Sequence, residues 1–183
     1  MARILGISGS LRTGSFNTAL LRAAQALQVQ GVELELATLH GIPLYDGDLE
    51  QGEGEPPAVA ALKARVLACD GLLLATPEYN NGIPGVFKNA IDWLSRPPAE
   101  APAVFGGRPV ALVGASPGGF GTILAQDAWL PVLRTLGIRF WSQGRLMVSR
   151  AGQAFDAQGA LVDERTTAQL AAFLAGYRDF IDG

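Results

Sequence analysis

The amino-acid sequence predicts an α/β fold in which a doubly wound parallel β-sheet carries helices on both faces. Short β-rich runs alternate along the chain with segments of helical periodicity, which is the pattern produced by successive β-α-β units. Two of these runs, Leu72–Ala75 and Val110–Val113, are continuously apolar. Central parallel strands have this composition because helices cover both of their faces.

Each expected element follows from its own local pattern. The first strand contains the apolar run Ile4–Ile7, and the first helix shows apolar residues at helical spacing from Leu20 to Leu27. The expected strands are Arg3–Ser8, Glu33–Thr38, Gly71–Thr76, Pro109–Ala115 and roughly Arg139–Val148. The expected helices are Asn17–Gln30, Pro57–Ala68, Pro84–Leu94, Thr122–Leu136 and Glu164–Ile181.

The remaining segments and the composition indicate one domain. The Pro- and Gly-rich segments Gly41–Pro57 and Arg96–Gly107 are interpreted as long connections, not as domain boundaries. The chain has 183 residues, of which 49% are hydrophobic and 17% are charged. We therefore expect residues 1–183 to form a single domain with a well-filled core.

Charge and cysteine content exclude several classes of function. A net charge of −3, without a basic cluster, argues against a nucleic-acid or anionic-membrane partner. One cysteine, Cys69, and one histidine, His40, exclude a multi-thiolate or multi-histidine metal site within the chain. We expect Cys69 to be a small buried residue and His40 a surface or loop residue. With no signal peptide and no apolar run of about 18 residues, we expect a cytoplasmic protein.

The loop Gly9–Asn17, between the first strand and the first helix, is a candidate anion site. Free backbone N–H groups and the positive end of the helix dipole point at whatever occupies such a loop. The loop adds hydroxyl, amide and guanidinium groups from Ser10, Thr13, Ser15, Asn17 and Arg12. An arginine at a helix N-terminus opposes the dipole unless an anion lies between them. The alternative is an ordinary polar turn in which Ser15 or Asn17 caps the helix.

Three familiar motifs were considered and rejected. The first loop has no Lys followed by Ser or Thr after its second glycine, which a nucleotide triphosphate loop requires. Its glycines also do not have the spacing of a dinucleotide-binding fingerprint. Both absences favour a monophosphate as the ligand. The run Gly114–Gly118 matches the Gly-x-Ser-x-Gly nucleophile elbow of hydrolases. However, Pro117 has no N–H to donate to an oxyanion, and His40 precedes Ser116 where a triad histidine should follow it.

Two further loops are expected at the same sheet edge, where ligands of open α/β sheets bind. In Pro77–Gly85, Asn80, Asn81 and Gly82 tolerate positive φ and Tyr79 supplies a flat face or a hydroxyl. In Ser116–Thr122, three glycines allow the backbone to approach a planar object closely. Either loop alone fits ordinary turn chemistry, but together with an anion loop they suit the phosphate and the ring of flavin mononucleotide (FMN).

With these residues in view, the sequence resembles the NADPH-dependent FMN reductase family, a flavodoxin-like group that includes chromate, quinone and azo-dye reductases. The resemblance covers about residues 3 to 150. It is carried by Gly9–Asn17, Pro77–Asn80, Ile83–Trp93 and Ile42–Glu50. It implies a five-stranded sheet of order 2-1-3-4-5, bound FMN, NADPH or NADH as co-substrate, and a homodimer or homotetramer.

Roles for individual residues come from this resemblance. Ser10, Arg12, Ser15 and Asn17 should hold the phosphate of FMN. Pro77, Glu78, Tyr79 and Asn80 should line the flavin ring, and Ser116 and Gly119 should close its far side. Lys88 and Asp92 lie one helical turn apart and are interpreted as a structural or interfacial pair.

The leading hypothesis is a ping-pong reductase that passes two electrons from NAD(P)H to a quinone, flavin, azo or metal-oxyanion acceptor. The cofactor supplies the redox chemistry, so no protein acid, base or nucleophile is required. Two rivals stay open at this point. One is a flavodoxin-type electron carrier that oxidises no pyridine nucleotide, and the other is a flavin-free binding or regulatory module with the same fold.

Overall fold

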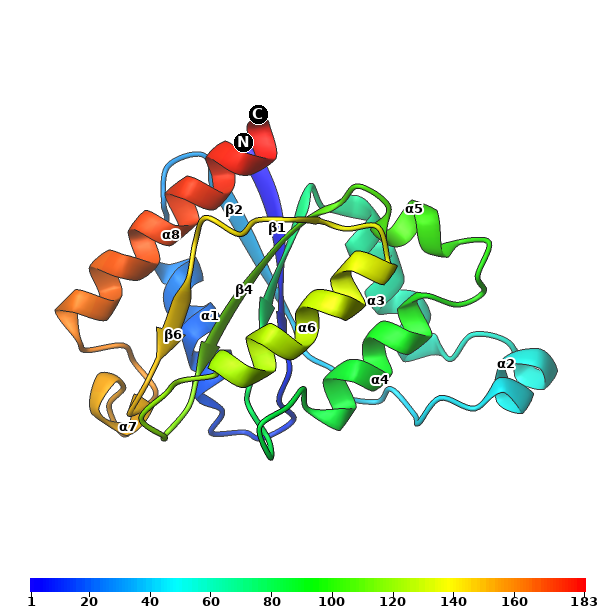
Figure 1. The fold of residues 1–183 in the computed structure, drawn as a ribbon, viewed down its shortest axis with the longest axis horizontal. Helices are drawn as coiled ribbons and strands as arrows, with labels where there is room; N and C mark the ends of the chain where they lie inside the picture. Colours follow the sequence, from blue (N-terminus) through cyan, green and yellow to red (C-terminus); the bar gives the residue numbers. More distant parts are fainter.

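The computed structural model describes residues 1–183 and confirms the expected α/β architecture (Figure 1). The strands are β1 (Ala2–Ser8), β2 (Val32–Ala37), β3 (Gly71–Ala75), β4 (Pro109–Ala115), β5 (Arg139–Phe140) and β6 (Leu146–Val148). The helices are α1 (Phe16–Ala26), α2 (Gly47–Glu53), α3 (Pro57–Ala68), α4 (Gly85–Leu94), α5 (Ala101–Phe105), α6 (Ile123–Thr135), α7 (Ala151–Ala154) and α8 (Glu164–Asp182).

The sheet is parallel throughout and has the order that the resemblance implied. The strands follow as β2-β1-β3-β4-β5, and β6 pairs with β4 beyond the end of β5. Ser8 lies opposite Ala75, and Ala115 lies opposite Val148, so the strands end at the same edge. The loops that follow β1, β3 and β4 therefore emerge together, at the lower edge of the sheet in Figure 1.

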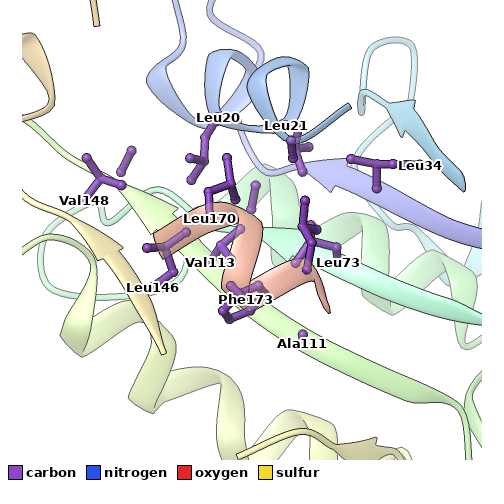
Figure 2. Packing of buried hydrophobic residues seen from close by; sticks show 14 of the residues in the cluster. Leu20, Leu21, Leu34, Leu73, Ala111, Val113, Leu146, Val148, Leu170 and Phe173 are labelled. Atoms are coloured by element: carbon purple, nitrogen blue, oxygen red, sulfur yellow. The ribbon is translucent and has the colours of Figure 1, made fainter. Parts of the chain in front are cut away.

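Alternate residues of the central strands pack into two separate hydrophobic cores, one on each face of the sheet. Leu73 and Val113 face α1 and α8, where they join the cluster drawn in Figure 2 with Leu20 and Leu170. The neighbouring residues of the same strands face α3, α4, α5 and α6. This division follows from the period of two in a strand, and it explains why the central strands carry no polar alternation.

The fifth strand was predicted as one segment, Arg139–Val148, and this prediction is wrong. The backbone leaves the sheet after Trp141, whose N–H still donates to the carbonyl of Val110 at 2.9 Å. The indole of Trp141 turns into the core against Phe173 and Tyr177. Gly144 passes so close to this ring that a Cβ there would lie 2.2 Å from it. The loop around the buried indole thus divides the edge into β5 and β6, and the sheet has six strands, not five.

Both long connections contain a short helix that the sequence analysis did not predict. The first contains α2, none of whose residues is buried, and the second contains α5. Lys63 of α3 fixes the second connection because its ammonium donates to the carbonyl of Arg96 at 2.7 Å and to Glu100 at 2.9 Å. The same ammonium pairs with Glu55. These contacts attach the connections to α3, on the face opposite α1 and α8.

The burial of Cys69 and the membrane-spanning potential of the helices were the two remaining structural questions. Cys69, expected to be buried, is only partly buried at the C-terminal cap of α3, where its thiol donates to the carbonyl of Val66. None of the helices combines the length and the apolar character that crossing a membrane requires.

Candidate functional site

The loop after β1 is folded around the start of α1. Ser15 is the N-cap, and its hydroxyl accepts the N–H of Thr18 at 3.3 Å. The N–H of Ser15 donates to the carbonyl of Arg12 at 3.1 Å, which closes the loop into a tight turn. Ser15 and not Asn17 is thus the capping residue that the alternative interpretation of this loop named. The hydroxyl of Ser15 is a buried acceptor in this arrangement and retains its own proton for another partner.

This loop presents a group of unpaired donors. The backbone N–H groups of Thr13, Gly14, Phe16 and Asn17 make no hydrogen bond within the chain. Those of Phe16 and Asn17 belong to the first turn of α1, where the helix dipole is positive. An anion in front of the turn would satisfy these donors together, as a bound phosphate does at other helix N-termini.

Arg12 adds a free positive charge to the same place. The side chain is exposed and forms no ion pair within the chain. Its guanidinium lies over the loop, where a Cβ on Gly14 would be 3.5 Å from Nη2. A guanidinium without a carboxylate, set beside unpaired N–H groups, is an arrangement that a phosphate dianion completes.

The first and second loops meet through Ser10 and Tyr79. Ser10 is 4% exposed, and its hydroxyl accepts the N–H of Arg12 at 3.2 Å and lies 3.4 Å from the phenol oxygen of Tyr79. Tyr79 itself is 48% exposed and lines the cleft between the loops. The contact spans 69 residues of sequence and brings a candidate phosphate ligand and a candidate ring ligand to one place.

The tip of the second loop is a two-residue hairpin. Tyr79 and Gly82 exchange backbone hydrogen bonds of 3.2 and 3.1 Å, and Asn80 and Asn81 between them have φ values of 51° and 61°. Positive φ at both central residues defines a type I′ turn, for which asparagine is suited. Positive φ is thus confirmed at Asn80 and Asn81 but not at Gly82. The turn leaves the N–H groups of both asparagines without a partner in the chain.

Glu78 connects the second loop to α6. One carboxylate oxygen accepts the N–H groups of Leu124 and Ala125 at 2.9 and 3.0 Å. The side chain of the N-cap residue Thr122 caps no backbone N–H of the helix, so Glu78 satisfies two of these free donors from another segment. One oxygen of the carboxylate is therefore used within the protein, and Glu78 also lines the cleft between the loops.

Asn17 connects α1 to β4. Its amide donates to the carbonyl of Ala115 and accepts the N–H of the same residue, both at 2.9 Å. Both groups are buried, and the bonds join positions 98 residues apart. The side chain of Asn17 thus holds the first and third loops together, while its backbone N–H has no partner in the chain.

The third loop has its own internal bonds. The hydroxyl of Ser116 donates to the carbonyl of Gly121 at 2.6 Å, and Gly121 has a φ of 63°. Gly114, just before the loop, lies where a Cβ would be 2.6 Å from the carbonyl oxygen of Thr76. Ser116 is therefore bonded within its loop, and no hydrogen bond joins it to His40. The rejection of a hydrolase elbow is consistent with this geometry.

Together the three loops form one cleft of about 70 Å³ at the end of the sheet. The sequence-predicted residues in its wall are Ser10, Arg12, Ser15, Asn17, Pro77, Glu78, Tyr79 and Ser116. Asn80 and Gly119 are outside the wall, on the hairpin tip and in the exposed bend of the third loop. Phe16, Ala115 and Pro117 also line the cleft and were not assigned as site residues, because nothing in their residue types signals a ligand.

Three other residues named in the sequence analysis, His40, Lys88 and Asp92, have structural contacts. His40 is exposed, as expected, and its Nε2 lies 3.1 Å from the carbonyl oxygen of Leu11, so it supports the first loop from outside. Sequence analysis missed this contact because it crosses 29 residues. Lys88 and Asp92 form the expected i,i+4 ion pair, with a distance of 2.7 Å between Nζ and Oδ1.

The fold and the site define a class of protein: a flavodoxin-like α/β protein with a strand-end cleft suited to a phosphorylated cofactor. Comparison with known proteins is more specific. The family profile described as NADPH-dependent FMN reductase matches residues 2–153. The chain therefore belongs to the NADPH-dependent FMN reductase family, a group of oxidoreductases.

Individual relatives agree with this assignment. An NAD(P)H-dependent FMN reductase of Pseudomonas aeruginosa is 49% identical over 163 residues, which cover 89% of this chain and 86% of that protein. A quinone reductase of Escherichia coli is 35% identical over 181 residues, covering 98% of this chain and 95% of that protein. The solved structure of FerB, a flavoenzyme NAD(P)H:(acceptor) oxidoreductase from Paracoccus denitrificans, superimposes with a TM-score of 0.88. It is 34% identical and covers 100% of this chain and 98% of that one.

Proposed function

We propose that this protein is an FMN-dependent NAD(P)H oxidoreductase that passes two electrons to a small-molecule acceptor by a ping-pong mechanism. The observation that carries the proposal is the meeting of three strand-end loops around unpaired N–H groups and an uncompensated arginine. When bound, FMN would supply the hydride and electron chemistry. A quinone is the acceptor class that we favour, because the relative from Escherichia coli is named a quinone reductase.

The phosphate of FMN would bind at the start of α1. Arg12 would provide the charge, and Ser10 and Ser15 would contribute hydroxyl groups. Asn17 would contribute its backbone N–H, since its amide is bonded to Ala115. Phosphate binding at this point uses donors that are already oriented by the Ser15 cap, so little ordering is required on binding.

The flavin ring would lie between the second and third loops. Pro77, Glu78, Tyr79 and Asn80 would border one side, with the unpaired N–H of Asn80 available to an oxygen or nitrogen of the ring. Ser116 and Gly119 would border the other side. The bonds of Glu78 to α6 fix the second loop, and the bond between Ser116 and Gly121 fixes the third loop, so both borders of the ring would be held in place.

A visible absorption spectrum of the purified protein, taken without oxygen before and after NADPH addition, tests the proposal. Flavin bands that bleach on NADPH addition and return with a quinone support it. Bands that persist would identify an electron carrier. No bands, even after FMN is supplied, would identify a flavin-free module.

We further propose that residues 1–183 act as one FMN-binding domain within a homodimer or homotetramer. Phe120, Ile123, Leu124 and Leu130 are exposed along and just before α6, and the last three border an apolar groove with Phe140. Exposed apolar side chains gathered in this way are typical of an interaction surface. Light scattering combined with size-exclusion chromatography tests the assembly, and a monomer at micromolar concentration would contradict it.

A further inference from the structure

A second, larger cavity lies on the other side of the third loop. Its volume is about 460 Å³, and it is bordered by β6, α7 and the first turns of α8. Figure 1 shows β6 and α7 next to the end of β4, at the same edge of the sheet as the candidate flavin cleft, with the start of α8 to their left. The volume is within the range of small-ligand sites, about 300 to 1,000 Å³.

Two unpaired arginines line this cavity from different elements. Arg150 comes from the start of α7 and Arg165 from the first turn of α8. Both are exposed, and neither forms an ion pair within the chain. Further donors that make no side-chain hydrogen bond in the chain, from Ser149, Gln153 and Gln169, complete the wall.

A single carboxylate, from Asp163, borders the same cavity. It is already bonded as the N-cap of α8, because its Oδ1 accepts the N–H of Thr166 at 2.7 Å. The attraction for an anion therefore comes from the two guanidinium groups and not from the helix terminus. Two cations against one bonded carboxylate leave the wall with an excess of positive charge.

The backbone of Arg150 is bonded to the loop that borders the flavin cleft. Its N–H donates to the carbonyl of Gly118 at 2.9 Å, and the N–H of Ala151 donates to the carbonyl of Ser116 at 3.0 Å. Arg150 has φ 48° and ψ 45°, a left-handed conformation that residues other than glycine and asparagine rarely adopt. Residues held in such conformations gather at ligand sites. The third loop thus separates two cavities, with the candidate flavin cleft on one side and the arginine cavity on the other.

We propose that this cavity binds the 2′-phosphate of NADPH. The inference rests on the proposed function, in which the nicotinamide approaches the open face of the flavin. An extended dinucleotide that crosses the third loop would bring its adenosine half to Arg150 and Arg165. Guanidinium groups bind a phosphate monoester through paired, charge-assisted hydrogen bonds, and NADH lacks that group. Arg150 and Arg165 are therefore the residues that would favour NADPH over NADH.

Direct binding tests this site without electron transfer. Isothermal titration of the FMN-loaded protein with adenosine 2′,5′-bisphosphate should show binding that 5′-AMP and inorganic phosphate do not match. The variants Arg150→Asn and Arg165→Gln should each weaken binding of the bisphosphate about tenfold or more, as expected for a hydrogen bond to a charged group. Asparagine tolerates the left-handed conformation, so Arg150→Asn should keep its local fold. Arg134→Gln, an exposed arginine on α6 outside this cavity, is the matched control.

Kinetics provide the second readout. The ratio of kcat/KM for NADPH to that for NADH should fall about tenfold in each cavity variant and stay constant in the control. An unchanged ratio, equal losses for the bisphosphate and 5′-AMP, or inorganic phosphate that binds as tightly as the bisphosphate would each overturn the inference. A wild-type protein that oxidises neither nucleotide would instead refute the proposed function, and the titration would still decide whether the cavity binds the bisphosphate.

Discussion

Replacing Arg12 with alanine isolates the contribution of a single charge to cofactor binding. The guanidinium lies over the anion loop and has no carboxylate partner, so its removal leaves no group of the protein unpaired. A charge-assisted hydrogen bond contributes about 1.5 to 3 kcal/mol. The dissociation constant for FMN should therefore rise about 10- to 150-fold. The free energy of unfolding of the apoprotein should change by less than about 0.5 kcal/mol, as for other exposed substitutions.

The assay compares two ligands that differ only in the phosphate. Apoprotein is titrated with FMN and with riboflavin, and flavin fluorescence reports the bound fraction. The substitution should weaken FMN binding and leave riboflavin binding unchanged, because riboflavin has no group for Arg12 to contact. Arg134→Ala, which removes an exposed arginine from the last turn of α6, serves as the control for net charge.

Two results would refute the reasoning. Unchanged FMN affinity would show that Arg12 does not contact the phosphate. Equal losses for FMN and riboflavin would show that the residue acts on the ring or on the fold of the loop. Chemical denaturation of the apoprotein separates these last two possibilities, since a change in the loop fold would lower the free energy of unfolding.

Three further predictions concern the framework of the site. Asn17→Ala should lower the free energy of unfolding by about 2 to 4 kcal/mol in urea denaturation, because both backbone groups of Ala115 lose a partner while buried; a loss below about 1 kcal/mol would contradict this. Gly114→Ala should lower the free energy of unfolding by about 3 kcal/mol or more, because the new Cβ would be 2.6 Å from a backbone oxygen. The control Gly152→Ala has open space around the new Cβ and should keep the wild-type melting temperature. Burial of Lys63 opposes its charged form and lowers its pKa. The carboxylates of Glu55 and Glu100, which are bonded to the ammonium, have the larger combined effect and raise the pKa of Lys63 above the ordinary 10.5. The stability that charged Lys63 contributes is fully present below its ordinary pKa of 10.5 and is lost as the pH rises through the raised pKa. Lys63→Met should therefore remove this loss of stability at alkaline pH, and an unchanged dependence of the unfolding free energy on alkaline pH would contradict the prediction.

The sequence indicated the fold well because the relevant signals are local. A run such as Leu72–Ala75 is apolar on both faces, and this composition is compatible with few positions other than a central parallel strand. Parallel strands end at a shared edge, so the strand pattern of the sequence itself predicts that the three loops meet. The edge strand was harder to predict. Its division depends on where the Trp141 indole turns, which is decided by residues of α8 far along the chain.

Within the site, residue types were predictable from the sequence but side-chain partners were not. A loop with serine, arginine and asparagine at the start of a helix indicates an anion site from composition alone. The structure decided that the Asn17 amide holds Ala115 and that the Glu78 carboxylate caps α6, leaving backbone N–H groups to face the ligand. These bonds join residues 98 and 47 positions apart. A hydrogen bond across such a distance leaves no periodic trace in the sequence, so only the tertiary structure could decide it.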